Sequence, residues 1–477
     1  MPSVALLTDL YELTMAYGYW RSAKAEDEAA FHLFFRENPF GGGYTIAAGL
    51  EAAIDYLDHL RFSDLDLDYL RTLGLFDEEF IGVLRRFEFA CDVDAVPEGT
   101  VVFPHEPLVR VRGPILQAQI VESALLNIIN FQSLIATKAA RVVYAAKGDP
   151  VVDFGLRRAQ GIDGANSASR AAYIGGCSGT SNVMAGAMFG IPPKGTHAHS
   201  WVMSFRSEAE AFDTWARVMP NNSVLLVDTY NTLDGVRHAI ETAKIMRGEG
   251  RELQGIRLDS GDLAYLSIQA RKMLDDAGFP KVTITASNEL DEHIIASLKD
   301  QGARIDVWGV GTRLITAYDQ PALGGVYKLT AIKPKGGAWT HKIKLSEQAV
   351  KISTPGVLQV RRFDGGDMIW DELSVSVAAP ASGAGRPRTI VDPADMTRRK
   401  TFDDDGADLL VPIYRGGKRV YDPPPLDEIR HRREEQLASF HPGIKRFENP
   451  HSYPVGLEQT LFDLKTRLIL EARGFAA

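Results

Sequence analysis

The chain has 477 residues and a formal net charge of −9, from 53 Lys and Arg against 62 Asp and Glu. Its content of 45 % hydrophobic and 24 % charged residues is typical of a soluble globular protein and excludes disorder for most of the chain. The acidic balance argues against a protein that binds nucleic acid or an anionic membrane. It also makes an anionic small-molecule substrate awkward, so the local residues must decide that point.

The cysteines and the N-terminus predict a cytoplasmic protein. Cys91 and Cys177 are too few for a disulfide framework or a thiolate zinc site, which fits a reducing compartment. Asp9 and Glu12 interrupt the first apolar stretch, and no Lys or Arg precedes it, so it is not a signal peptide. Residues 171–193 lack charge, but their glycines, prolines and hydroxyl groups would be unsatisfied in lipid. We expect a buried loop and helix there.

The first hundred residues alternate helical and strand patterns, and a β segment and a long apolar run follow them. Valines in alternate positions and flanking prolines over 96–114 predict two hairpin strands. The apolar run 115–146 predicts one long helix or two. Shorter elements are expected over 6–20, 50–60 and 77–87 as helices and over 31–35 as a strand.

From about residue 150 the pattern changes to repeated strand and helix units. Polar or small residues end successive apolar runs at Asp228, Asp259, Ser287 and Gly309, at steps of 31, 28 and 22 residues. This spacing suits the βα units of a parallel sheet. Barrels and open α/β sheets place their chemistry at the carboxyl ends of such strands. The final stretch, 330–477, reads as a smaller α/β or β-rich lobe.

The segment IRLDSGDL, residues 256–263, places Asp259 and Asp262 on either side of Ser-Gly at a strand end. Carboxylate oxygens there could hold ribose hydroxyls or Mg²⁺, whereas Asp262 could simply cap the next helix. We expect the cap for Asp262 and the functional role for Asp259. Arg257 precedes Asp259 by two residues and so shares its strand face, which places a cation beside the carboxylate.

Two other strand ends carry weaker signals. The GVGT turn at 309–312 could direct backbone N–H groups at a phosphate, although such a turn with two glycines is common. Phe154, followed by Arg157 and Arg158, could grip a flat heteroaromatic acid by stacking and charge. A core phenylalanine with two solvated arginines explains the same residues and is favoured by the residues alone. A Walker-type loop is absent from the sequence, so any ATP binds in another way.

The segment KGTHAHSW, residues 194–201, contains His197 and His199. Their spacing fits a pair of metal ligands, but no cluster supplies a third and fourth ligand. A histidine can instead act as a nucleophile that carries a phosphoryl group. From these residues alone, one structural and one partly exposed histidine are expected.

Together these segments resemble the nicotinate phosphoribosyltransferases, a family of type II phosphoribosyltransferases. The similarity covers most of residues 5–362, and the order and number of the motifs make it far more specific than any one of them. The tail is matched only loosely. The matching stretches are LLTDLYELTMA, FFRENPFGGGYTIAAGL, VDFGLRRAQG, GGCSGTSNVMAG, GTHAHS, LLVDTYN, IRLDSGDL, TASNELDE, WGVGTRL and PGVLQVRR.

The resemblance implies an α/β fold in which an irregular α/β (TIM-like) barrel lies beside an N-terminal α/β sandwich domain completed by C-terminal residues. We place the sandwich domain at 1–130 and the barrel, with the active site, at 131–330. Residues 331–477 form a mixed α/β segment expected to pack on both. The resemblance also implies a homodimer whose active sites lie at the subunit interface.

The implied reaction joins nicotinate to 5-phosphoribosyl 1-pyrophosphate, giving nicotinate mononucleotide and pyrophosphate in the salvage route of NAD biosynthesis. ATP hydrolysis to ADP and phosphate is coupled to it through a phosphohistidine at His199. With His199, the residues Asp259 and Arg257 are expected to be catalytic. Mg²⁺ is the implied cofactor, placed near Asp259 with no certain protein ligand.

The remaining expected site residues fall into two groups, both implied by the resemblance. The nicotinate group, in which Tyr11 could belong to the partner subunit, is Tyr11, Phe154, Ser181, Thr196 and Arg257. The phosphoribosyl and phosphate group is Arg157, Asp259, Ser287, Gly309, Gly311 and Thr312.

One position bears on substrate choice. In the similar nicotinamide enzymes an aspartate follows Gly-Thr in this loop, whereas this chain has Ser181. A carboxylate there would repel the carboxylate of nicotinate, so serine favours the acid over the amide. The alternatives are a nicotinamide or quinolinate phosphoribosyltransferase, which Ser181 and the intact GTHAHS disfavour, and a catalytically silent relative. The presence of His199, Asp259 and Arg257 disfavours a silent relative.

Overall fold

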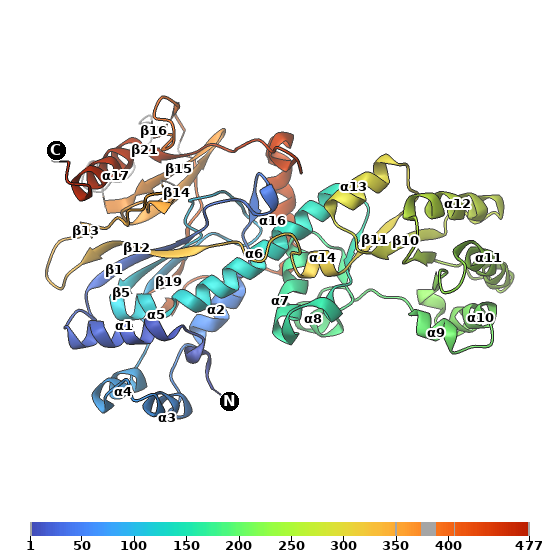
Figure 1. Cartoon of the computed structure of the whole chain (residues 1–477), viewed down its shortest axis with the longest axis horizontal. Helices are drawn as coiled ribbons and strands as arrows, with labels where there is room; N and C mark the ends of the chain where they lie inside the picture. Colours follow the sequence, from blue (N-terminus) through green and yellow to red (C-terminus); the bar gives the residue numbers. More distant parts are fainter. Residues whose placement is uncertain (1, 349–350, 374–387, 405, 476–477) are drawn as a thin grey trace. The chain divides into compact units, whose positions relative to one another are not determined.

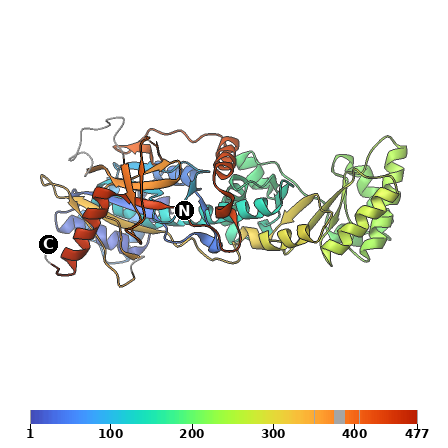
Figure 2. The same cartoon turned by 90° about the horizontal axis from the view of Figure 1, so that it is seen from above.

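The computed structural model describes the chain as two compact units, which are treated separately (Figures 1 and 2). Unit 1 comprises Met1–Leu134 with Ala322–Ala477, and unit 2 comprises Ile135–Pro321. Within the described ranges, no helix is both long and apolar enough to cross a membrane. The described residues are 2–348, 351–373, 388–404 and 406–475.

Unit 1 is built on an antiparallel seven-stranded sheet whose strands come from both ends of the chain. Strand β1 (Glu28–Phe34) pairs with β5 (Val109–Pro114) on one side and with β12 (Val326–Lys333) on the other. Strand β19 (Val411–Arg415) pairs with β3 (Asp92–Ala95). C-terminal residues therefore complete the N-terminal domain, as the resemblance implies.

The other elements of unit 1 extend this arrangement. The full order of the large sheet is β13-β12-β1-β5-β3-β19-β20, and a mixed sheet has the order β17-β16-β21-β15-β14-β18. The remaining strands are β2 (Thr45–Ile46), β4 (Val101–Val102), β13 (Thr340–His341), β14 (Leu358–Phe363), β15 (Gly366–Asp371), β16 (Arg388–Val391), β17 (Arg399–Phe402), β18 (Ala407–Asp408), β20 (Lys418–Arg419) and β21 (Val455–Glu458). The helices are α1 (Leu10–Arg21), α2 (Leu50–Asp58), α3 (Asp64–Thr72), α4 (Glu78–Arg85), α5 (Ile115–Ile120), α16 (Leu426–Ser439) and α17 (Gln459–Ala472).

The predicted hairpin over 96–114 is wrong. Both strands exist, but β4 pairs with β2, whereas β5 pairs with β1 and β3. The loop between the two strands turns the chain, so that each strand meets a different partner. In this turn the N–H of Phe103 donates to the buried carboxylate of Glu106 at 2.9 Å, and His105 has a φ of 71°. The apolar run 115–146 forms two helices, α5 and α6 (Glu122–Ala145).

Unit 2 contains six parallel strands in the order β7-β6-β11-β10-β9-β8. The first strand along the chain, β6, pairs with the last, β11, which is the circular order of a barrel. The circle has one gap, between β7 and β8, which makes this barrel irregular, as expected. The strands are β6 (Val151–Asp153), β7 (Gly179–Thr180), β8 (Val224–Leu226), β9 (Gly255–Leu258), β10 (Thr283–Asn288) and β11 (Val307–Val310).

Helices connect these strands and lie outside them in Figure 2. For example, α12 contacts both β9 and β10, the two strands that it connects. The helices of unit 2 are α7 (Gly161–Ile174), α8 (Val183–Phe189), α9 (His199–Met203), α10 (Glu208–Val218), α11 (Thr232–Gly248), α12 (Leu263–Asp276), α13 (Glu292–Asp300) and α14 (Thr312–Ile315).

Buried ion pairs fix the C-terminal half of α6 within unit 2. Glu292, on α13, accepts from Lys138 Nζ and from Arg141 Nε, each at 2.7 Å. Lys138 Nζ also lies 2.7 Å from Asp319 Oδ2. Burial raises the pKa of Glu292, whereas Lys138 and Arg141 lower it. The effect of the two cations is larger than that of burial, so the net pKa lies below the usual range. Loss of either cation would leave buried charge uncompensated.

Candidate active site

Most of the predicted site residues of unit 2 lie at or just beyond the carboxyl ends of its parallel strands, whereas Thr196 and His199 lie between α8 and the start of α9. Because these strands run in the same direction in one sheet, their carboxyl ends share one edge. The strands of this edge contribute Phe154 and Arg157 after β6, Ser181 after β7, Asp259 after β9, Ser287 within β10, and Gly309, Gly311 and Thr312 within or after β11.

Arg257, on β9, joins four of the predicted residues. Its Nε donates to Ser287 Oγ at 2.7 Å, and its Nη1 donates to Thr196 Oγ1 at 3.2 Å. Its Nη2 donates to Asp259 Oδ1 at 2.7 Å, which confirms the predicted cation beside this carboxylate. Ser287 Oγ also donates to Asp259 Oδ1. The guanidinium is therefore held in a fixed orientation by groups from three segments.

The ring of Phe154 lies beneath this guanidinium, with Arg257 Cζ 5.3 Å from the ring centroid. Gly309 makes room for the ring, because a Cβ at this position would lie 2.6 Å from Phe154 Cδ2. A pyridine ring stacked between the two groups needs about 7 Å, two van der Waals separations of ~3.5 Å. Insertion of a ligand ring thus requires the guanidinium to move outward.

His199 and Asp228 form a second cluster next to Asp259. His199 Nε2 lies 3.2 Å from Asp228 Oδ1, and the His199 side chain is 40 % exposed while that of Asp228 is fully buried. Asp228 Oδ2 accepts from the N–H of Asp259 at 2.9 Å and from Ser260 Oγ at 2.6 Å. Asp228 thereby links the histidine to the loop that carries Asp259.

His197 faces the interior instead. Its Nε2 accepts the N–H of Leu226 at 3.2 Å, and its ring lies 5.0 Å from that of Trp215. Burial, reinforced by the charge of Arg257, lowers the pKa of His197 to about 4, so its ring is neutral at neutral pH. The structure therefore contains one structural and one partly exposed histidine, as the segment predicts.

The other predicted residues of unit 2 stand apart from the Arg257 cluster. Arg157 is exposed and makes no ion pair with any described residue. Ser181 donates its N–H to the carbonyl of Asp153 at 2.7 Å. Gly311 precedes α14, and Thr312 Oγ1 contacts Glu289 at 3.3 Å. Among the described residues, no side-chain hydrogen bond or ion pair joins them to Arg257, Ser287 or Asp259.

Two neighbouring expectations are settled by local geometry. Asp262 caps α12, since its Oδ1 accepts the N–H of Tyr265 at 3.0 Å, which confirms the predicted cap. The uncharged stretch 171–193 forms the end of α7, strand β7 and α8, with mixed burial. The predicted buried loop and helix is thus confirmed for its first half, whereas Val183 and Met184 on α8 are exposed.

Tyr11 belongs to unit 1, on α1, and its side chain is 45 % exposed. Burial of part of the ring and the carboxylates of Glu122 and Glu12 raise the pKa of Tyr11 well above its usual range. Its hydroxyl therefore stays protonated. Glu12 is buried beside it and accepts from Ser123 N at 2.8 Å, which fixes α1 against the start of α6.

Metal-binding potential is limited to single carboxylates. Among the described residues, no group of three or more His, Cys, Asp or Glu side chains could hold a metal ion. Asp259 uses Oδ1 for its two hydrogen bonds, whereas Oδ2 accepts none from a described residue. This fits Mg²⁺, which commonly takes one or two carboxylates and completes its shell with phosphate oxygens and water.

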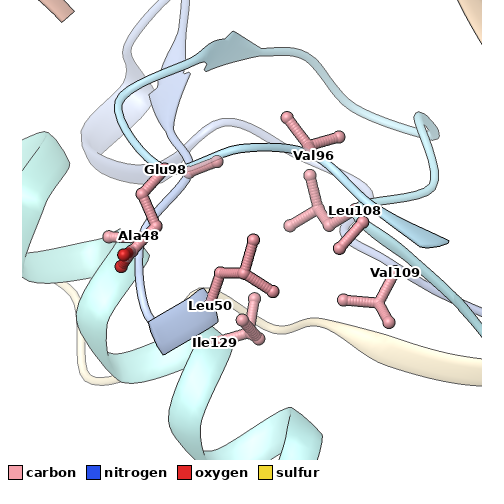
Figure 3. Close-up of a pocket in the computed structure, with 9 residues that line it drawn as sticks. Ala48, Leu50, Val96, Glu98, Leu108, Val109 and Ile129 are labelled. Atoms are coloured by element: carbon pink, nitrogen blue, oxygen red, sulfur yellow. The ribbon is translucent and has the colours of Figure 1, made fainter. Parts of the chain in front are cut away.

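A small pocket in unit 1 offers a contrast (Figure 3). Its walls are apolar apart from Glu98, whose Oε1 accepts the N–H of Gly49 at 2.6 Å. It has no cationic lining residue and does not suit an anionic ligand. The strand-end site, in contrast to this pocket, combines an aromatic face with a guanidinium held by hydrogen bonds. The pocket is lined by Ala47, Ala48, Leu50, Ala95, Val96, Glu98, Leu108, Val109 and Ile129.

The strand-end site can therefore bind a flat ring with an acidic substituent, hold ribose hydroxyls on Asp259, and present a histidine supported by a buried carboxylate. Models of the nicotinate phosphoribosyltransferase (NAPRTase) family match three successive stretches of the chain. They are the N-terminal domain at residues 6–130, the family model at 150–349 and the C-terminal domain at 361–465. The chain belongs to the nicotinate phosphoribosyltransferase family.

Relatives in this family match nearly the whole chain. The nicotinate phosphoribosyltransferase of Bacillus subtilis is 44 % identical and the alignment covers 99 % of this chain and 96 % of that protein. The nicotinate phosphoribosyltransferase pncB2 of Mycobacterium tuberculosis is 43 % identical, with 97 % and 94 % covered. The crystal structure of human nicotinic acid phosphoribosyltransferase has a TM-score of 0.83 and 31 % identity, and covers 97 % of this chain and 99 % of that one.

Sequence reasoning left two residues of this candidate site without a role. Asp228 ends a strand, at the same position in the strand pattern as Asp259, but no motif pairs it with a particular histidine. Asp153 ends β6 in the same way and is completely buried. The signal for both was present, since a carboxylate after an apolar strand needs a partner. Only the fold shows which partner each one has.

Proposed function

We propose that this chain condenses nicotinate with 5-phosphoribosyl 1-pyrophosphate, giving nicotinate mononucleotide and pyrophosphate, with ATP hydrolysed to ADP and phosphate. The observation that carries the proposal is the guanidinium of Arg257, held over the ring of Phe154 and bonded to Thr196, Ser287 and Asp259. A guanidinium is suited to a carboxylate and an aromatic face at once. Membership of the nicotinate phosphoribosyltransferase family supports this substrate.

The residues act mainly by positioning and electrostatics. Phe154 and Arg257 hold the pyridine ring on its two faces, so that its nitrogen points at C1′ of the ribose. Asp259 accepts ribose hydroxyls and balances the positive charge that develops on the ribose ring as the C1′–O bond to pyrophosphate breaks. The pyridine nitrogen forms the new bond to C1′. No strong general base is required, because the nitrogen carries no proton at the pH of the cell.

Phosphate groups need positive charge that the net charge of −9 does not supply. Arg157 is exposed and makes no ion pair with a described residue. It follows β6, and the neighbouring strand β11 ends in the turn at 309–312, which offers backbone N–H groups. We assign the 5-phosphate to this edge of the site, with Ser287 and Thr312 as further donors. A local concentration of donors can bind anions on a mildly acidic protein.

Mg²⁺ would supply charge neutralisation for the pyrophosphate as it leaves. Oδ2 of Asp259 is the protein oxygen available to hold the ion. The remaining ligands would come from the substrate and water.

His199 is the residue we assign to ATP. Asp228 accepts a hydrogen bond from the Nε2–H group of His199, and this bond fixes the tautomer of the ring. The lone pair of Nδ1 is then available to attack the γ-phosphorus of ATP. The bond from phosphorus to the ADP oxygen breaks as the N–P bond forms, and later hydrolysis releases phosphate. With the γ-³²P label on ATP, the wild type should acquire acid-labile radioactivity and His199→Ala should not. Label retained in that variant would move the phosphoryl group elsewhere, His197 being tested first.

Ser181 supports nicotinate over nicotinamide. Its hydroxyl makes no hydrogen bond to a described residue and is free to donate to a carboxylate. A nicotinamide-specific or quinolinate-specific enzyme is the alternative within the same chemistry. Nothing in the geometry of the site favours it.

We also propose a cytoplasmic homodimer in which Tyr11 of one subunit completes the site of the other. The support is an exposed apolar surface at the start of α1 and just before it. Leu10, Tyr11 and Met15 on α1, and Leu7 before it, are 38–50 % exposed. Cys91 and Cys177 are buried and neither forms a disulfide, which fits a reducing compartment.

Mixing inactive variants tests the shared site. Tyr11→Ala and His199→Ala chains, each inactive or nearly so, should recover about a quarter of wild-type activity when co-refolded, because half of the dimers are hybrids with one intact site. No recovery, with both variants dimeric by sedimentation, would place Tyr11 in the site of its own subunit.

The proposed reaction is tested by pyrophosphate release. Release should require nicotinate, 5-phosphoribosyl 1-pyrophosphate and Mg²⁺ together, and should rise with ATP. Release that is independent of any pyridine would contradict the proposal.

A further inference from the structure

Asp153 is a fully buried carboxyl group that the proposed reaction does not use. It ends β6, immediately before Phe154, and its side chain points into the protein rather than toward solvent. Among the described residues, no Lys, Arg or His forms an ion pair with it. A buried carboxyl without a cation is costly unless hydrogen bonds compensate it, so its retention calls for an explanation.

Three donors from three segments satisfy this carboxyl group. Oδ1 accepts the N–H of Gly155 at 2.8 Å, and Oδ2 accepts the hydroxyls of Ser169, on α7, at 2.8 Å and of Thr180, on β7, at 2.7 Å. Burial raises the pKa of Asp153, and the three hydrogen bonds lower it in part.

The same residue joins the two sides of the pyridine site. Asp153 pairs with Thr180 in the sheet, so the next residues, Phe154 and Ser181, lie opposite each other. The carbonyl of Asp153 accepts the N–H of Ser181 at 2.7 Å. Thr180 Oγ1, which donates to Asp153, also accepts the N–H of Asn182 at 3.0 Å, so residues on both sides of Ser181 are linked to the Asp153 carboxyl group.

The side of the site that carries Phe154 has independent support. The N–H of Phe154 donates to the carbonyl of Val310 at 2.8 Å, and its ring fills the space left by Gly309. The side that carries Ser181 depends on β7, which is two residues long and lies at the gap in the barrel. There the N–H of Thr180 donates to the carbonyl of Pro192 at 3.1 Å, and the carbonyl of Thr180 accepts the N–H of Lys194 at 2.9 Å. The hydroxyl of Thr180, the residue before Ser181, donates to the Asp153 carboxyl group, so this group acts on the position of Ser181.

We propose that Asp153 is a positioning residue that fixes Ser181 opposite Phe154 and thereby sets the preference for a pyridine carboxylate over a pyridine carboxamide. The inference rests on the proposed function, since it concerns the same site. Asp153 does not touch the substrate. It acts through Thr180 and the backbone of residue 181.

Steady-state kinetics of the full-length protein with nicotinate and nicotinamide test this proposal. In Asp153→Ala and Thr180→Val the KM for nicotinate should rise at least tenfold, with kcat within threefold of the wild type. The ratio of kcat/KM for nicotinate to that for nicotinamide should fall at least tenfold. Asp153→Asn should stay within threefold of the wild type, because the two hydroxyl groups can turn to accept from its amide.

Ser178→Ala is the matched control. Its hydroxyl donates to the carbonyl of Val151 at 3.0 Å, so it also bonds β6 to the start of β7, but without involving Asp153. This variant should leave unchanged both the KM for nicotinate and the ratio of kcat/KM for nicotinate to that for nicotinamide. Thr180→Val is nearly isosteric with the wild type. If Asp153→Ala does not fold, the KM for nicotinate and the substrate preference of Thr180→Val test the proposal.

The outcomes separate the two proposals. A wild type that does not convert nicotinate would overturn the proposed function. If the wild type converts nicotinate but Thr180→Val matches Ser178→Ala in KM and in substrate preference, the role of Asp153 is overturned. A fall in kcat with unchanged preference would also overturn it, since that result indicates a general structural role.

Discussion

The Nε2 atom of His199 lies 3.2 Å from the Oδ1 atom of Asp228, a carboxylate whose side chain is fully buried. The other oxygen of Asp228 holds the loop of Asp259. One carboxylate therefore connects the histidine that we assign to ATP with the residue that we assign to ribose. Phosphorylation of His199 would add negative charge to the imidazole beside the Asp228 carboxylate. Because Asp228 also holds the loop of Asp259, this change of charge gives a direct physical route from the histidine to the sugar site.

Asp228→Asn should lower the rate of His199 phosphorylation at least tenfold. The amide is isosteric but neutral, so it neither fixes the reactive tautomer nor stabilises the cationic imidazole that follows attack. Acid-labile ³²P transferred from ATP in a rapid-quench experiment measures the rate. Asp262→Asn, which alters only a helix cap, is the control and should label at the wild-type rate. Equal labelling of the two variants would rule out the role of Asp228.

Gly309→Ala should displace the Phe154 ring. The added Cβ would lie 2.6 Å from Phe154 Cδ2, so we expect a stability loss of about 1–3 kcal/mol and an increase in the KM for nicotinate. Gly311→Ala is the matched comparison, because its Cβ would have ordinary contacts, the nearest at 3.5 Å. Urea unfolding and nicotinate kinetics on both variants give the answer. Similar unfolding free energies for the two would contradict this account of Gly309.

Ser181→Asp should reject nicotinate. Two carboxylates about 4 Å apart repel each other by roughly 4 kcal/mol at an effective dielectric constant of about 20, so kcat/KM for nicotinate should fall at least a hundredfold. The value for nicotinamide should fall much less, because the amide can donate to the new carboxylate. Ser181→Asn separates charge from size and should retain most of the activity with nicotinate. If Asn and Asp behave alike, charge at this position does not select the substrate.

His197 should make the stability of the protein depend on pH below neutrality. Its pKa is about 4 in the folded protein and about 6.5 in an unfolded chain, so the unfolded state binds the proton first as pH falls. The stability contribution is complete above about pH 6.5 and is lost as pH falls toward 4. Between pH 7 and 4.5 the difference is about 2–3 kcal/mol.

His197→Gln keeps an acceptor for the N–H of Leu226 and removes this titration. The decrease in unfolding free energy between pH 7 and 4.5 should therefore be smaller by about 2–3 kcal/mol in this variant. His59→Gln, whose side chain is 66 % exposed, should follow the wild type. Parallel curves for His197→Gln and the wild type would show that His197 titrates normally in the folded state.

Strand ends and their polar residues could be predicted from the sequence because parallel strands leave a periodic signal. Four of the predicted residues indeed gather around Arg257, and the pairing with Asp259 follows from their spacing on one strand face. The barrel order needed the structure. The same βα pattern fits an open sheet, and only the pairing of β6 with β11 distinguishes the two.

Contacts between distant segments could not be predicted. Nothing local indicates that Asp228 bonds a histidine 29 residues earlier, or that Asp153 collects hydroxyls from Ser169 and Thr180. The hairpin over 96–114 failed for a related reason: alternation predicts strands but not their partners. The buried turn at Glu106 redirects the chain there.

The most direct test of the account is a side-by-side product analysis. The purified protein is incubated with 5-phosphoribosyl 1-pyrophosphate, Mg²⁺ and ATP, with either nicotinate or nicotinamide, and the nucleotides are separated by chromatography. We predict nicotinate mononucleotide as the main product, with a kcat/KM for nicotinate at least a hundredfold above that for nicotinamide. Conversion of nicotinamide alone, or of neither pyridine, would contradict the account.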